Sequence, residues 1–172
     1  MSDGVSESAR MSSAAEARFR INAPNSLPRR IKVIALDRAS EPVVKQLAQA
    51  HWNNASFFTA SAFAGEPPGR DFSMQGWLAD LAGRTKDLID EVNTADLVVM
   101  VATAGEYAQA AALIGEACSL KRVNTTGLIL GSAAATDEML SKTLSRLRPW
   151  SLMLVIASGA DYIEDMLIAL RA

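Results

Sequence analysis

The stretch that decides the fold is residues 95–131, ADLVVMVATAGEYAQAAALIGEACSLKRVNTTGLILG. It opens with an apolar run that shows no alternation, which is typical of a strand buried on both faces. A turn at residues 103–106 follows, then a helical segment and a second apolar strand that ends at Gly131. Strand, turn, helix and strand in this order predict a βαβ unit of a parallel sheet.

The same alternation continues on both sides of this unit. We expect further strands at residues 31–36, at residues 55–60 and in WSLMLVIA. We expect further helices in the segment after Ser40, in WLADLAGRTKDLIDEVNTA, in TDEMLSKTLSRLR and in ADYIEDMLIALRA. The sequence therefore predicts an α/β fold, a three-layer α/β/α sandwich around a parallel, Rossmann-like sheet of about five strands. Two strand orders fit this pattern, 2-1-3-4-5 and 3-2-1-4-5.

The chain is expected to consist of an N-terminal arm, residues 1–28, and one Rossmann-like domain, residues 29–172. The arm is rich in Ser, Ala and charged residues, so it buries too little apolar surface to offset the entropy of ordering. Between residues 52 and 77 the chain concentrates its aromatic side chains and carries the loop AGEPPGRDFSMQG. We interpret this region as core packing, with an interaction surface or a lid over the crevice as the alternative.

Composition and charge exclude several classes of function. The net charge of −2 provides no basic field for nucleic acid or anionic lipid. No apolar run is long enough to span a membrane, and the N-terminal residues lack the apolar centre of a secretory signal. We therefore expect a cytoplasmic protein that binds neither nucleic acid nor membrane.

The motifs of several enzyme classes are missing. The chain has no G-x-G-x-x-G, no P-loop and no G-x-S-x-G. His51 is the sole histidine, and we interpret it as a partner of the dipole at a helix C-terminus. Cys118 is the sole cysteine, in a helical position where thiols are inert packing groups, so no disulfide or structural metal site is expected within the chain.

Ligands of open parallel sheets bind beyond the carboxyl ends of the strands, where the strand order reverses. The candidate ligand-binding residues in this position are Asp37, Arg38, Ser40, Thr103, Gly105, Glu106, Gly131 and Ser132. Thr59, Ser61, Thr136, Ser158, Gly159 and Asp161 also follow strands and would line the same crevice. Ser40, Thr136 and Ser158 have an alternative role as helix caps.

The turn at residues 103–106 has the position of a phosphate-binding turn. Gly105 would let a ligand approach the backbone, or would simply relieve a tight turn. Glu106 argues against a phosphate, because we place it in the first turn of the following helix, where its carboxylate would repel a second anion. A ribose or sugar hydroxyl, or a hydrated divalent ion, would suit Glu106 better.

Three segments resemble the nucleotide-binding domain of the tubulin/FtsZ family. RIKVIALDRASEPVVKQLAQAHWNNASFFTA is similar to that family's first strand, helix and second strand, and residues 95–131 to its central strand, phosphate turn and helix. SKTLSRLRPWSLMLVIASG is similar to the helix and strand that follow. The family's glycine-rich signature reads ATAGEY here, so the resemblance implies a nucleotide-binding scaffold that does not hydrolyse GTP in the family's way.

DLVVMVATAGEYAQAAALIGEA also resembles the sugar-isomerase (SIS) domain, whose Ser/Thr-rich turn binds sugar phosphates. Thr103 and Glu106 match that turn, whereas Ala102 and Ala104 replace two of its serines. This resemblance implies a sugar-phosphate site.

Three hypotheses follow from the sequence. The first is a non-catalytic or weakly catalytic module that binds a nucleotide or small ligand and acts through self-association or a protein partner. The second is a binding protein or enzyme for a sugar phosphate or another small metabolite. The third is a structural subunit without a ligand. The cofactor is unknown in all three, with a nucleotide as the candidate.

Overall fold

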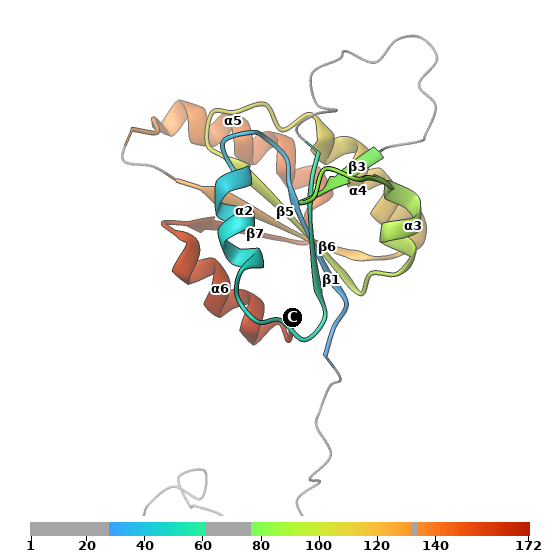
Figure 1. Cartoon of the computed structure of the whole chain (residues 1–172). Helices are drawn as coiled ribbons and strands as arrows, with labels where there is room; N and C mark the ends of the chain where they lie inside the picture. The colour runs from blue at the N-terminus through green and yellow to red at the C-terminus, as the bar shows by residue number, and fades with distance from the viewer. Residues whose placement is uncertain (1–27, 61–76, 132–133) are drawn as a thin grey trace, which may run out of the picture.

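The computed structural model describes residues 28–60, 77–131 and 134–172 (Figure 1). The arm expected at residues 1–28, apart from Pro28, lies outside the described residues. So do the candidates Ser61 and Ser132 and the whole of the loop AGEPPGRDFSMQG expected after the second strand.

The described residues form one mixed sheet and five α-helices. The strands are β1 (Ile31–Ala35), β2 (Ala55–Thr59), β3 (Trp77–Asp80), β4 (Thr85–Asp87), β5 (Leu97–Thr103), β6 (Asn124–Leu130) and β7 (Met153–Ala157). The helices are α2 (Glu41–Ala48), α3 (Leu88–Asn93), α4 (Ala110–Lys121), α5 (Asp137–Leu147) and α6 (Ala160–Ala169), with a 3-10 turn η3 (Arg148–Trp150).

The strand order is β4-β3-β2-β1-β5-β6-β7. Strands β2, β1, β5, β6 and β7 run parallel, and this part of the sheet has the order 2-1-3-4-5, the first of the two expected orders. Strands β3 and β4 extend the sheet beyond β2 as an antiparallel hairpin. The chain order therefore reverses between β1 and β5, which is where ligands bind in sheets of this topology.

Helices cover both faces of the sheet, as the three-layer prediction requires. On one face Val33 and Val99 pack with α2 and α6. On the other face Ile34 and Met100 pack with α3, α4 and α5. Figure 1 shows α2 and α6 together on one side of the strands and α3 and α4 on the opposite side.

Strand β5 lies in the middle of this core. Its residues Leu97 to Ala102 are all buried, because helices cover both faces and β1 and β6 pair with both edges. The uninterrupted apolar run of the sequence is thus explained by position: no face of β5 meets water.

The prediction of a helix in WLADLAGRTKDLIDEVNTA is wrong for the first half of this segment, which forms the β3–β4 hairpin. The Asp80 carboxylate accepts hydrogen bonds from the backbone N–H groups of Ala82 and Arg84 and from Arg84 Nε, and Gly83 adopts a positive φ of 81°. These hydrogen bonds close the turn. Glycine suits position 83 because a positive φ is readily available only to a residue without a Cβ atom. Helix α3 begins only at Leu88, with Asp87 as its cap.

The helix after β5 also begins later than expected. We placed Glu106 in its first turn, but α4 starts at Ala110. Residues 103–106 form an isolated turn instead, and its N–H groups find acceptors outside α4. Glu106 is therefore an exposed residue of the turn and not part of a helix N-terminus.

Candidate functional site

Asp37 links the two turns that flank the reversal of strand order. It follows β1 and is 95% shielded, with a relative exposure of 5%. Its Oδ1 accepts a hydrogen bond from the Ser40 backbone N–H at 2.8 Å, and its Oδ2 accepts one from the Thr103 backbone N–H, also at 2.8 Å. The carboxylate thus sits at the start of α2, in the place where a helix N-terminus would hold an anionic ligand.

Ser40 completes this turn instead of capping α2. It occupies the N-cap position but makes no side-chain cap hydrogen bond. Its buried hydroxyl donates to the Asp37 carbonyl oxygen at 2.9 Å. The capping role expected for Ser40 is therefore wrong, although the one expected for Thr136 is confirmed by a hydrogen bond from Met139 N to Thr136 Oγ1 at 3.2 Å.

All four backbone N–H groups of the turn at residues 103–106 donate to acceptors of the chain itself. Thr103 N–H donates to Asp37, and Ala104 N–H to the Leu130 carbonyl at 3.1 Å. Gly105 N–H donates to Thr143 Oγ1 at 3.0 Å, and Glu106 N–H to the Thr103 carbonyl at 3.1 Å. A phosphate cradle needs such groups to point at the ligand, so this turn is not arranged as one.

Helix α5 packs directly over Gly105. Gly105 has a φ of 88°, and a Cβ atom there would lie 2.3 Å from Met139 Cε. Thr143, buried one helical turn further along α5, accepts from Gly105 and donates to the Met139 carbonyl at 3.2 Å. The lack of a side chain at Gly105 therefore allows α5, and not a ligand, to pack against the backbone of the turn.

Sequence reasoning missed Thr143. The residue stands in the helical pattern DEMLSKTLSRL, where threonine carries no special signal. Only the crossing of α5 over the β5–α4 turn brings its hydroxyl to Gly105, so the contact depends on tertiary packing.

The Thr103 hydroxyl differs from its surroundings, because it has no hydrogen-bond partner among the described residues although solvent does not reach it. It lies at the end of β5, next to the Asp37 carboxylate that its own N–H contacts. A buried polar group without a hydrogen-bond partner destabilises the folded state by about 1–3 kcal/mol. A ligand that hydrogen-bonds to this hydroxyl, at the carboxyl end of the sheet, would remove that cost.

Other sequence candidates lie around this centre. Arg38 and Glu106 are exposed, and Gly131 N–H donates to the Ala157 carbonyl at 3.1 Å. At the end of β2, Thr59 Oγ1 donates to Glu41 Oε1 at 2.8 Å. Glu41 is the first residue of α2, so a second carboxylate joins Asp37 at this helix N-terminus.

Two hollows in the described part of the surface lie away from Asp37 and Thr103. An apolar groove of about 450 Å³ is lined by Ala108, Gln109, Ala112, Ser145, Arg146, Pro149 and Trp150. The Arg146 guanidinium lies 5.8 Å from the ring centroid of Tyr107, beside this groove. A polar hollow of about 280 Å³ lies at the ends of α3 and α4 and is lined by Val92, Asn93, Ala95, Asp96, Lys121, Arg122 and Val123.

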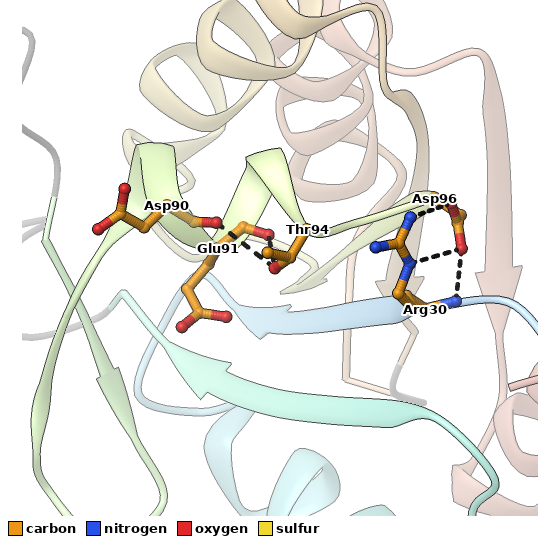
Figure 2. A network of polar contacts seen from close by, with 5 residues as sticks. All are labelled: Arg30, Asp90, Glu91, Thr94 and Asp96. Carbon is orange, nitrogen blue, oxygen red and sulfur yellow. Dashed lines mark hydrogen bonds and ion pairs between the residues drawn. The ribbon is translucent and has the colours of Figure 1, made fainter.

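Two basic residues at the start of β1, Arg30 and Lys32, are paired with acids. Figure 2 shows Arg30 facing Asp96, with a distance of 3.0 Å between Arg30 Nη2 and Asp96 Oδ1. Hydrogen bonds from the side chain and the backbone N–H of Arg30 lower the pKa of Asp96. The side-chain hydrogen bond to Asp96 in turn raises the pKa of Arg30. Lys32 Nζ lies 2.9 Å from Glu91 Oε2. Arg30 and Lys32 thus tie the start of β1 to the start of β5 and to α3.

Within the described residues, the cysteine and the histidine do not lie together. Cys118 is buried, and burial raises the pKa of its thiol to about 12, so the thiolate is not formed near neutral pH. His51 is exposed in the loop between α2 and β2, at the amino ends of the parallel strands and past the helix terminus. Within the described ranges no three His, Cys, Asp or Glu side chains group as metal ligands, and no helix is long and apolar enough to span a membrane.

Comparison with known proteins identifies no family for this chain. No family model matches the chain, and no curated protein matches it either. Among solved structures, the chain is similar to the apo form of a flavoprotein from Lactobacillus acidophilus, at 8% identity and a TM-score of 0.45, over 79% of this chain and 97% of that one. The comparisons give no support to the resemblance to the tubulin/FtsZ family or to the SIS domain. The described residues form an α/β fold with a seven-stranded, mostly parallel mixed sheet.

Proposed function

We propose that this protein is a non-catalytic module that binds a small ligand at the carboxyl ends of β1 and β5. Its ligand presents an uncharged, hydroxyl- or amide-bearing group to Thr103 and Asp37. The proposal keeps the binding site expected from the sequence and changes the chemistry of the ligand, because a nucleotide or sugar phosphate would need a phosphate-binding turn.

The observation that carries the proposal is that the backbone N–H groups of the turn already donate to acceptors of the chain itself. Asp37 takes the N–H groups of Ser40 and Thr103, and the remaining N–H groups of the turn donate to Leu130, Thr143 and Thr103. A phosphate at this place would lose these donors and would meet the carboxylates of Asp37 and Glu41. A neutral polar group avoids this repulsion. It can pair with the Thr103 hydroxyl, which solvent does not reach, once a small movement of the turn admits the ligand atom.

The absence of catalysis in this proposal rests on the same geometry. The cysteine is held as a neutral thiol, and the histidine lies at the opposite ends of the strands from Thr103. A mechanism that uses a thiolate or an imidazole needs that group within hydrogen-bond reach of the substrate, and both carboxylate oxygens of Asp37 already accept backbone N–H groups.

The test compares neutral ligands with their phosphate esters. Thermal-shift and calorimetric titrations would use riboflavin against FMN, adenosine against AMP, and glucose against glucose 6-phosphate. We expect a neutral member of these pairs to raise the midpoint of unfolding more than its phosphate ester at the same concentration, because the ligand that binds the folded state more tightly stabilises it more.

The Thr103→Val variant locates the site. Valine has the shape of threonine without the hydroxyl, so we expect it to keep the fold and to weaken the neutral ligand. Thr85→Val, on the exposed edge strand β4, is the matched control and should bind as the unaltered chain does. Tighter binding of the phosphate esters, or binding that Thr103→Val leaves intact, would contradict the proposal.

A further inference from the structure

Strand β7 forms one end of the sheet. It pairs with β6 on one side, and no other described strand pairs with its second side. An edge of this kind presents a row of backbone N–H and C=O groups to which another strand can add.

The side chains along this edge are apolar and exposed. Leu152 is 78% exposed, Met153 41% and Ile156 52%. No charged residue occurs between Ser151 and Ala160. Exposed edges of monomeric proteins usually carry charges, prolines or bulges that prevent pairing, and β7 carries none of these.

The opposite end of the sheet shows the protected form. Strand β4 is three residues long, and its sequence Thr-Lys-Asp follows Arg84. Charge and shortness both discourage pairing there. The contrast between two edges of one sheet indicates that β7 is covered in the functional protein.

We infer that β7 is the interface between two copies of this chain, which pair antiparallel across a twofold axis perpendicular to the sheet. Such an axis leaves each face of the sheet on the same side in both copies, so directly opposed residues point to the same face. Because side chains alternate along a strand, the two numbers of an opposed pair are both even or both odd. A pairing centred on Leu154 places Leu152 opposite Ile156 of the second copy and Met153 opposite its Val155. These two pairs, and the two Leu154 side chains that meet at the axis, are all apolar.

The first experiment measures the mass of the full chain in solution by sedimentation equilibrium over a wide range of concentrations. We expect a dimer of the unaltered chain and a monomer of Ile156→Lys. The matched control is Leu120→Lys, which places the same charge at a position 62% exposed on α4, away from the edge, and should remain a dimer. Circular dichroism checks that both variants are folded.

A cysteine cross-link tests the register. In the pairing centred on Leu154, the Leu154→Cys variant brings two thiols together at the axis, and mild oxidation should give a covalent dimer. Cys118 is buried and does not compete. A monomeric unaltered chain, or a dimer that survives Ile156→Lys, overturns the inference. If deletion of residues 1–27 converts a monomer to a dimer, that segment and not a second copy is the natural occupant of the edge.

Discussion

At the scale of single residues, Asp37 has the clearest structural role. Each of its two carboxylate oxygens accepts one backbone N–H, from Ser40 and from Thr103. In Asp37→Asn one of these N–H groups would face the amide NH₂ and lose its acceptor. We expect a loss of about 1–3 kcal/mol in the free energy of unfolding, measured by urea denaturation. Asp165→Asn, at an exposed position of α6, is the control and should change it little. Equal stability of the two variants would show that the Asp37 contacts are dispensable.

Gly105 offers a second prediction at this scale. Its φ of 88° is costly for any residue with a Cβ, and that Cβ would also meet Met139. We expect Gly105→Ala to lose about 1–2 kcal/mol through the backbone alone, measured by thermal unfolding.

The double variant Gly105→Ala, Met139→Ala separates the two causes. It removes the steric contact and leaves the backbone strain, so it should still be about 1–2 kcal/mol less stable than Met139→Ala alone. Equal stability of the double variant and Met139→Ala would assign the cost to the contact with Met139.

At the scale of elements, Lys32 and Glu91 join β1 to α3. Both side chains are partly buried, and Lys32 Nζ also lies 5.7 Å from the ring centroid of Phe58. Lys32→Met would leave the Glu91 carboxylate without its cation, and we expect a loss of about 1–3 kcal/mol in urea denaturation. The double variant Lys32→Met, Glu91→Leu should recover most of it, since apolar pairs often replace shielded ion pairs without loss. A double variant less stable than Lys32→Met would show that the ion pair itself stabilises the fold.

The strands that the sequence predicts well are those whose apolar runs are buried on both faces. Strands β1, β5 and β6 were found near their expected residues because burial alone dictates their composition. The hairpin β3–β4 was missed because its residues carry an apolar spacing that suits a helix equally well. A side-chain contact, the Asp80 carboxylate with its own turn, decides between the two.

The candidate site was only partly predictable for the same reason. The position of the crevice follows from topology, and Asp37, Ser40, Thr103 and Gly105 do come together there. The hydrogen bonds that close the turn could not be predicted from the sequence. Two of the acceptors, Thr143 and Leu130, are distant from the turn in sequence. Ser132 and Ser61 lie outside the described residues and stay predictions.

At the scale of the whole molecule, the exposed acids give stability that depends on pH. Arg30 lowers the pKa of Asp96, and Arg84 lowers the pKa of Asp80. A carboxylate whose pKa is depressed by folding stabilises the folded state above its unfolded pKa, about 3.9, and this contribution disappears as the pH falls through the folded pKa.

We therefore expect the free energy of unfolding to fall below about pH 4, and to fall less steeply in Asp96→Asn. Urea denaturation at a series of pH values measures both slopes. Because the Arg30–Asp96 pair is exposed, added salt should reduce the difference between the two chains. Identical slopes would mean that Arg30 does not act on Asp96 in solution.

The central claim is that the turn at residues 103–106 is closed by the chain itself and is not open to phosphate. NMR on the ¹⁵N-labelled full chain tests it most directly, by following the amide hydrogens of Thr103, Ala104, Gly105 and Glu106. Our account predicts slowed hydrogen exchange at these amides without any ligand, and unchanged chemical shifts when inorganic phosphate is added. Rapid exchange at Thr103 and Gly105, together with shifts that saturate with phosphate, would contradict it and restore the anion site that the sequence first suggested.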